Sequence, residues 1–382
     1  MDDRRIFSSY WGHEQVVAHF NDEFFIATLL QFESSLVSCQ GDVGIIPRDA
    51  AFPIQKAISS VLIDDDLIEK LNVSTADNGI PTIALVAAIK EKLDKVFHKY
   101  LHYGVTSQDL IDTAHMKALQ QLNQDFIRLL GQGLRANVLP WLQQADWICM
   151  ARTRQQQALP VTFGYKLYHW FMPLLASLES LQALQFPVSL GGPVGDMRAF
   201  GSQGKALTAA LAAKMGLDDF GAVWHQNRQP VLAILNAYEG VLIQLRKILQ
   251  DWLFLANSEV GELRLESKGK SSAMAHKNNP VQLEQAMVLV KIALDSVQNY
   301  KQHAIFSSER DGVSWTLEWY YLTGLDTQLQ LVVHAFMKTM GLIEWQKEAI
   351  EAFTKSFEGQ LQEPEFMPEL MDELERKLKT LD

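Results

Sequence analysis

The chain has 382 residues, of which 48% are hydrophobic and 21% are charged. This length and apolar content exclude a small single-core scaffold and a disordered chain, and they indicate two or three packed units. Its 34 Lys and Arg residues against 45 Asp and Glu residues give a formal net charge of −11, which opposes binding to nucleic acid.

Apolar residues recur at helical spacing over long windows, while alternating strand patterns are scarce, which predicts an all-α fold. In chain order, long helices are expected over residues 107–130, 161–184, 231–259 and 280–303. Pro173 should kink the second helix, and Asn279 with Pro280 should start the fourth as N-cap and first-turn proline.

Helices of this length predict an elongated central bundle over residues 102–343, whose apolar stripes need cover along their full extent. A smaller N-terminal helical domain is expected over residues 1–101 and a short C-terminal helical segment over 344–382. Part of the cover for the bundle is expected from other subunits.

The cysteines and the N-terminus bear on the setting of the protein. Cys39 and Cys149 are far apart and show no metal-ligand spacing, so we expect reduced thiols, no metal site and a cytoplasmic location. The first residues lack the apolar core of a signal peptide, and no stretch is long and apolar enough to span a bilayer. We therefore expect neither a membrane nor nucleic acid among the partners.

The segment 266–280 lies between two predicted long helices and locally reverses the sign of the charge. It gathers Lys268, Lys270, Lys277 and His276 among hydroxyl and amide side chains, with Glu266 as its single carboxylate. A mobile loop of this composition would attract a carboxylate-bearing ligand. From composition alone, a solvated basic linker is the alternative explanation.

Several stretches carry a resemblance to a known enzyme family. The run Ser271-Ser272-Ala273-Met274-x-x-Lys277-x-Asn279-Pro280 resembles the signature loop of the fumarase/aspartase superfamily, and residues 104–109 and 190–195 resemble its other shared regions. Within the superfamily, residues 78–81, 102–109, 224–228 and 309–315 are most similar to the 3-carboxy-cis,cis-muconate cycloisomerases.

The resemblance implies a mostly helical subunit that forms a homotetramer, with each active site built from segments of three subunits. Enzymes of this family remove a proton from the carbon beside a carboxylate and expel a leaving group from the adjacent carbon, or run the reverse addition. The resemblance also implies a small-molecule polycarboxylate substrate and no cofactor. In the cycloisomerases, an unsaturated polycarboxylate and its lactone interconvert.

By position in these motifs, the resemblance implies that Ser271, Lys277, Asn279 and Glu284 are catalytic, with Ser271 as the base. A serine hydroxyl is a weak base unless a positive charge stabilises its alkoxide, so Lys277 and loop closure would have to do this. An ordinary loop hydroxyl is the alternative for Ser271. The implied substrate-binding residues are His102, Thr106, Ser107, Thr153, Arg154, Gln156, Arg228, Ser272, Met274 and Arg310.

Several of the implied binding residues have structural alternatives. Thr106 or Ser107 could cap the helix that follows, and His102 could be a structural histidine. Arg228 and Arg310 could form surface salt bridges. The glycine-rich run 191–195 lacks the strand and acidic partner that accompany a dinucleotide-binding loop.

The sequence departs from the superfamily at the general acid. Arg154 stands where many members have a histidine that pairs with the glutamate at the position of Glu284, and Gln157 stands where cycloisomerases commonly carry one. Neither side chain exchanges a proton readily near neutral pH. In the signature loop, Lys270 and Ala275 replace the usual glycine and proline.

A lactonising reaction tolerates this loss better than an elimination, because its leaving or attacking group is a carboxylate and needs no protonation. Arg154 could bind that carboxylate, and it could pair with Glu284 when the site is empty. A fumarate-releasing lyase similar to adenylosuccinate lyase and a non-catalytic paralogue are the two alternatives.

Overall fold

The computed structural model describes residues 9–12, 16–266, 269, 274, 277–357 and 367–381. Helices dominate these residues, which confirms the predicted all-α class; the strands form two short antiparallel pairs. None of the described helices combines the length and the apolar character needed to cross a membrane.

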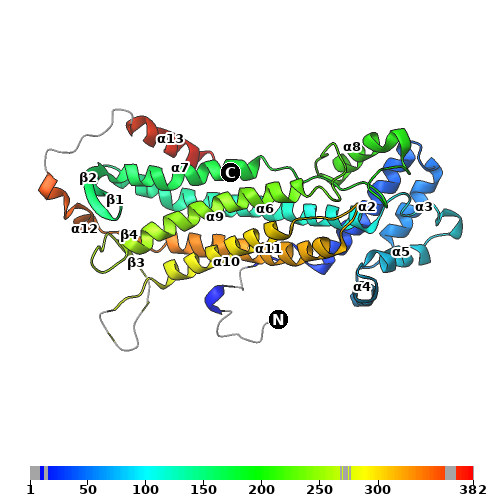
Figure 1. The fold of residues 1–382 in the computed structure, drawn as a ribbon, viewed down its shortest axis with the longest axis horizontal. Helices are drawn as coiled ribbons and strands as arrows, with labels where there is room; N and C mark the ends of the chain where they lie inside the picture. Colours follow the sequence, from blue (N-terminus) through cyan, green and yellow to red (C-terminus); the bar gives the residue numbers. More distant parts are fainter. Residues whose placement is uncertain are drawn as a thin grey trace.

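Five long helices form an elongated central bundle (Figure 1). They are α6 (Ser107–Trp141), α7 (Phe163–Gln182), α9 (Gln229–Leu255), α10 (Val281–His303) and α11 (Gly312–Met340). Helix α10 packs against α9 and α11, α7 packs against α9, and α11 packs against α6. At a rise of about 1.5 Å per residue, the length of α6 is about 50 Å, so the two ends of the bundle are far apart.

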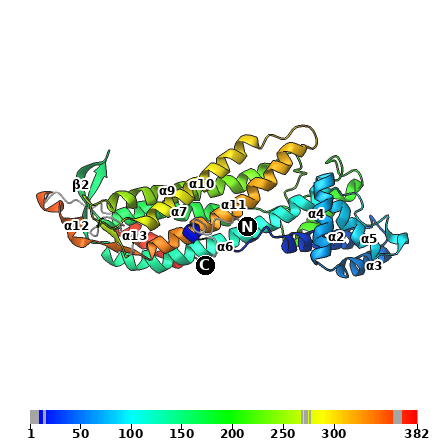
Figure 2. The ribbon, with the colours of Figure 1, turned by 90° about the horizontal axis from the view of Figure 1, so that it is seen from below.

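Further helices surround the end of the bundle where α6 begins (Figure 1). They are α2 (Asp22–Asp42), α3 (Arg48–Ser59), α4 (Asp65–Asn78), α5 (Thr82–Glu91) and α8 (Gly204–Met215), with a 3₁₀ turn at Lys95–Phe97. Side-chain caps fix two of these helix starts, because Asn21 and Asp64 accept hydrogen bonds from backbone amides in the first turns of α2 and α4. Figure 2 shows the joined ends of α10 and α11 leaning away from the other bundle helices at this end.

The opposite end of the bundle carries both strand pairs and the C-terminal helices. Strands β1 (Ile148–Thr153) and β2 (Gln156–Thr162) form a hairpin, and β3 (Leu263–Leu265) pairs with β4 (Ile343–Trp345). Helix α12 (Lys347–Glu351) follows β4, and α13 (Met367–Lys379) packs on α6 and α7. Stacked rings fill the core here, with Trp252 on Phe336 at 5.5 Å and Trp170 on Trp345 at 5.7 Å.

The helix predictions are confirmed with shifted ends. The helix expected at 231–259 is Gln229–Leu255, and the helix expected at 107–130 continues to Trp141. The predicted start of the fourth long helix is wrong by one residue, because the N-cap of α10 is Pro280 and Asn279 does not cap it. The hairpin over 148–162 was not predicted, since neither of its strands alternates clearly between apolar and polar residues.

Candidate active site

The predicted site residues fall into groups at opposite ends of the bundle. His102, Thr106 and Ser107 lie at the start of α6, whereas Thr153, Arg154 and Gln156 lie on the β1–β2 hairpin beyond its other end (Figure 1). The whole of α6 separates them, at about 50 Å by its helical rise. One chain therefore does not bring the two groups together.

Thr106 is the N-cap of α6, which confirms the capping alternative for this residue. It forms a capping box with Asp109, whose Oδ2 accepts a hydrogen bond from the Thr106 amide at 2.9 Å. Next to it, the Ser107 hydroxyl lies 2.5 Å from the hydroxyl of Thr82 at the start of α5. The partial positive charge of a long helix N-terminus favours an anion at this position.

Asp109 also holds the glycine-rich run against the start of α6. This fully buried carboxylate accepts hydrogen bonds from the amides of Gly191 at 2.6 Å and Gly192 at 3.0 Å, and it contacts His225 Nε2 at 2.7 Å. Gly192 has φ +75°, and a Cβ there would lie 2.6 Å from the carbonyl oxygen of Gly104. The glycines are therefore needed for close packing. The part played by Asp109 and His225 was not predicted, because their contacts join segments far apart in the sequence.

His102 adopts a left-handed backbone, with φ 57°, that directs its ring to Glu33 of α2. Its Nδ1 lies 2.5 Å from Oε1 of Glu33, whose side chain is fully buried. Burial opposes protonation of His102, but the Glu33 carboxylate outweighs burial and raises the pKa of the imidazole above its ordinary value. The histidine is therefore held by a buried partner at the rim of this group.

Arg228 has a different environment from either one expected for it. Its side chain is 1% exposed, so a surface salt bridge is wrong. The guanidinium donates to Asp112 Oδ2 at 2.8 Å and to both carboxylate oxygens of Glu318, and Trp224 and Phe306 flank it with ring centroids at 4.6 and 5.0 Å. The donors of Arg228 are taken up by internal partners, so the residue joins α6 to α11.

Arg310 lies in the connection between α10 and α11 and is exposed. It donates to the carbonyl oxygen of Pro193 at 3.1 Å, which ties this connection to the glycine-rich run. Among the described residues it forms no salt bridge. The surface salt bridge considered for Arg310 is therefore not what holds it.

Arg154 lies in the turn of the hairpin, where its backbone conformation is strained. Thr153 pairs with Gln156, and the two residues between them, Arg154 and Gln155, have φ of 50° and 67°. Such two-residue turns normally take Asn-Gly, because glycine and asparagine adopt this left-handed region more readily than other residues do. Arg154 is exposed and makes no ion pair within the described part of the chain. Strain at a displayed cation is typical of a functional position.

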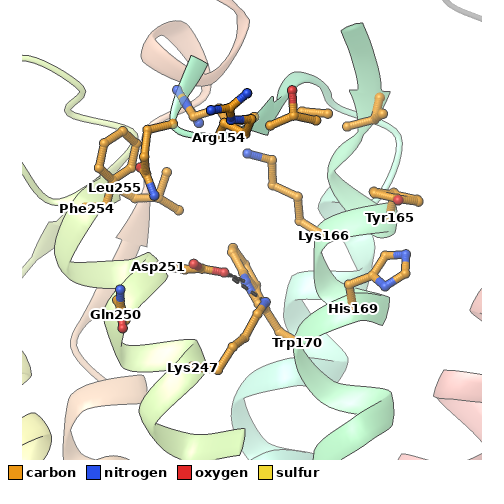
Figure 3. Close-up of a pocket in the computed structure, with 15 residues that line it drawn as sticks. Arg154, Tyr165, Lys166, His169, Trp170, Lys247, Gln250, Asp251, Phe254 and Leu255 are labelled. Atoms are coloured by element: carbon orange, nitrogen blue, oxygen red, sulfur yellow. Dashed lines mark hydrogen bonds and ion pairs between the residues drawn. The ribbon is translucent and has the colours of Figure 1, made fainter. Parts of the chain in front are cut away.

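A cleft of about 470 Å³ opens beneath this turn, between the hairpin, α7 and α9 (Figure 3). Lys166 points into it from α7, and its Nζ lies 3.9 Å from Glu262, which also pairs with Arg152. Across the cleft, Lys247 pairs with Asp251 at 2.8 Å. Together with Arg154, the cations of this end outnumber the carboxylates, so the cleft favours an anion.

The signature loop is described only in part. Ser271 and Ser272, with Lys268, Lys270, Ala275 and His276, lie outside the described residues. Of its remaining members, Met274 and Lys277 are exposed, and the Lys277 amide donates to the Met274 carbonyl at 3.1 Å. The Asn279 amide donates to the Gly269 carbonyl at 2.8 Å. Lys277 and Asn279 thus lie directly before α10, in backbone contact with earlier residues of the loop.

Glu284 lies in the first turn of α10 and is exposed. Its charge acts on Tyr10, whose pKa is raised by burial and by the Glu284 carboxylate. No ion pair joins Glu284 to Arg154 among the described residues. The pairing expected between these two residues is therefore absent within one chain.

Comparison with known proteins identifies the family. A family profile described as Lyase matches residues 13–293, most of the chain. The chain belongs to the fumarase/aspartase superfamily. It is an enzyme of that superfamily. The described residues contain no group of three or more His, Cys, Asp or Glu side chains that could hold a metal ion.

Named superfamily relatives differ in activity. A 3-carboxy-cis,cis-muconate cycloisomerase from Acinetobacter baylyi is 26% identical over 89% of this chain and 76% of its own length. An N-acetyl-S-(2-succino)cysteine lyase from Enterococcus italicus is 30% identical over 79% of this chain and 67% of its own length. Among solved structures, a fumarate lyase from Mesorhizobium has a TM-score of 0.76 at 24% identity, covering 87% of this chain and 76% of its own.

Proposed function

We propose that this superfamily member is a cycloisomerase that interconverts 3-carboxy-cis,cis-muconate, or a similar unsaturated polycarboxylate, and its lactone. The observation that carries the proposal is Arg154, a cation with no ion pair among the described residues, held in a strained turn above a cationic cleft. A guanidinium there can bind a carboxylate through two parallel hydrogen bonds, but it does not donate a proton. This suits a reaction whose attacking or leaving group is a carboxylate.

The reaction needs one proton transfer and one C–O bond change. In the lactonising direction, an oxygen of one substrate carboxylate adds to a carbon of the conjugated double bonds, and the carbon beside another carboxylate takes a proton from the Ser271 hydroxyl. The resulting alkoxide regains a proton from solvent. In the reverse direction, Ser271 removes that proton as the C–O bond breaks. Lys277 and Asn279 stabilise the negative charge that builds on the adjoining carboxylate. Ser272, Met274, Thr153 and Gln156 complete the proposed lining.

Such a site forms only where one end of the bundle in one subunit meets the opposite end of the bundle in another. We propose that a homotetramer brings the start of α6 from one subunit to the hairpin and signature loop of others, with Glu284 facing Arg154 across subunits. In the same proposal, residues 1–101, 102–343 and 344–382 are the three units of each subunit. The two cysteines are buried and free, which favours a cytoplasmic location.

A second candidate is a lyase acting on a succinyl adduct. The relative from Enterococcus italicus supports it, since it is named for N-acetyl-S-(2-succino)cysteine. An elimination of that kind gains from an acid that protonates the leaving group, and Arg154 stands at the position expected to supply one. The cycloisomerase is therefore preferred.

A substrate comparison tests this choice. The purified chain is given 3-carboxy-cis,cis-muconate and, separately, N-acetyl-S-(2-succino)cysteine, and lactone and fumarate are measured by chromatography. We expect lactone formation that disappears in Ser271→Ala and persists in the control Ser59→Ala, an exposed serine of α3. Release of fumarate without lactone would refute the cycloisomerase proposal and favour the lyase. Undiminished turnover in Ser271→Ala would refute the assignment of the base.

A further inference from the structure

A second cleft, of about 460 Å³, lies where α2 and α4 meet α6 and α11. Its walls are mostly apolar and include Phe25, Ile26, Leu71 and Ile111. This volume is within the range of about 300 to 1,000 Å³ that is usual for small-molecule sites. None of its lining residues belongs to the predicted active site, so the catalytic proposal leaves the cleft unexplained.

His115 is the buried polar group of this cleft. The residue is 7% exposed, and its buried Nδ1 has no hydrogen-bond partner among the described residues. The rings of Phe20 and Phe25 lie 5.6 and 6.0 Å from its ring. Burial lowers the pKa of His115 to about 4, so the ring is neutral near pH 7, with one donor and one acceptor nitrogen. A buried polar group left unpaired destabilises the protein, and a ligand that bonds to it would remove that cost.

Trp319 of α11 supplies a second unpaired group beside His115. Its Nε1 is buried without a partner in the part of the chain that the structure describes, and the two ring centroids are 6.3 Å apart. A hydroxyl both donates and accepts, so one hydroxyl oxygen between the rings can donate to the imidazole and accept from the indole. At the rim of the cleft, the carboxylate of Asp22 disfavours an anion.

From this juxtaposition we propose that the cleft binds an uncharged hydroxylated aromatic molecule of the phenol class. Its ring packs against Phe25, Ile26 and Leu71, and its hydroxyl bridges His115 and Trp319. This binding does not depend on the proposed reaction. An apolar ring without the hydroxyl would fill the same space but leave both nitrogens unpaired.

Calorimetric titration with phenol and with toluene, which has a methyl group in place of the hydroxyl, tests the proposal. We expect phenol to bind about tenfold more tightly than toluene, the gain of one or two buried hydrogen bonds. That preference should vanish in His115→Leu and weaken in Trp319→Phe. It should persist in His303→Leu, an exposed histidine at the end of α10.

Three results would overturn the proposal. They are the absence of saturable phenol binding, an unchanged preference for phenol in the two cleft variants, and displacement of phenol by 3-carboxy-cis,cis-muconate, which would assign the cleft to the catalytic site. Circular dichroism checks that each variant is folded. Should His115→Leu fail to fold, Trp319→Phe decides, because it keeps an aromatic ring and removes only the indole donor.

Discussion

Replacing Arg228 by methionine should destabilise the protein far more than it impairs substrate binding. The guanidinium lies between Asp112 and Glu318, and all three side chains are at most 1% exposed. Removing one partner of a buried ion pair costs about 3–5 kcal/mol, because the other charge stays buried and uncompensated. Here two carboxylates lose their cation, so we expect a loss of about 5 kcal/mol in the free energy of unfolding.

Protonation limits this loss. Burial raises the pKa of Glu318 even with the arginine present, so without Arg228 this carboxyl should take up a proton. A triple variant that adds Asp112→Asn and Glu318→Gln removes the buried charges together. It should recover most of the lost stability, since neutral groups of similar shape replace the whole ionic set.

Urea unfolding followed by circular dichroism measures these differences. The control is Arg128→Met, because Arg128 pairs with Asp125 at 2.7 Å on the surface, where a salt bridge contributes less than about 1 kcal/mol. The structural role of Arg228 would be refuted by a loss below about 1 kcal/mol in Arg228→Met combined with a raised KM. That result would restore the substrate-binding role expected from the sequence.

Three further predictions concern the two ends of the bundle. The pKa of His102 is raised in the folded chain, so its pairing with Glu33 stabilises the fold fully below about pH 6.5, and this stabilisation is lost as the pH rises through the raised pKa. Glu33→Gln should therefore flatten the decline in the free energy of unfolding above about pH 6.5. Gly192→Ala should lower the melting temperature, since its Cβ would meet the Gly104 carbonyl at 2.6 Å and φ is +75°; an unchanged value would contradict the packing described. Arg154→Gln should lower kcat/KM for the polycarboxylate about tenfold or more with little loss of stability, while Arg154→Lys recovers part of it in steady-state assays.

Local patterns in the sequence were enough to place the long helices. The side of α9 that carries Leu242, Leu245 and Leu249 is fully buried, as its periodicity indicates. The hairpin was not predicted, and the reason again lies in the local sequence. Its turn is Arg154-Gln155, without the glycine or asparagine that usually marks two left-handed residues, so the sequence carried no turn signal.

The roles of individual charged residues were harder to predict, because they depend on partners distant in the chain. Arg228 resembles a substrate-facing residue by its motif, yet it is buried by Asp112 and Glu318, which are 116 and 90 residues away. His115 gave no signal at all, since its cleft takes walls from four separate helices. Motif position therefore identified the family, whereas the burial and pairing of single side chains depend on the whole fold.

Solvent isotope incorporation tests the central claim most directly. In deuterium oxide, the hydroxyl of Ser271 exchanges its proton for deuterium, which the proposed mechanism then delivers to the carbon beside a substrate carboxylate. Mass and NMR spectra of the lactone should show one deuterium at that carbon with the native chain, and Ser271→Ala should form no lactone. Lactone that carries no deuterium, or labelled lactone formed at the native rate by Ser271→Ala, would contradict the account.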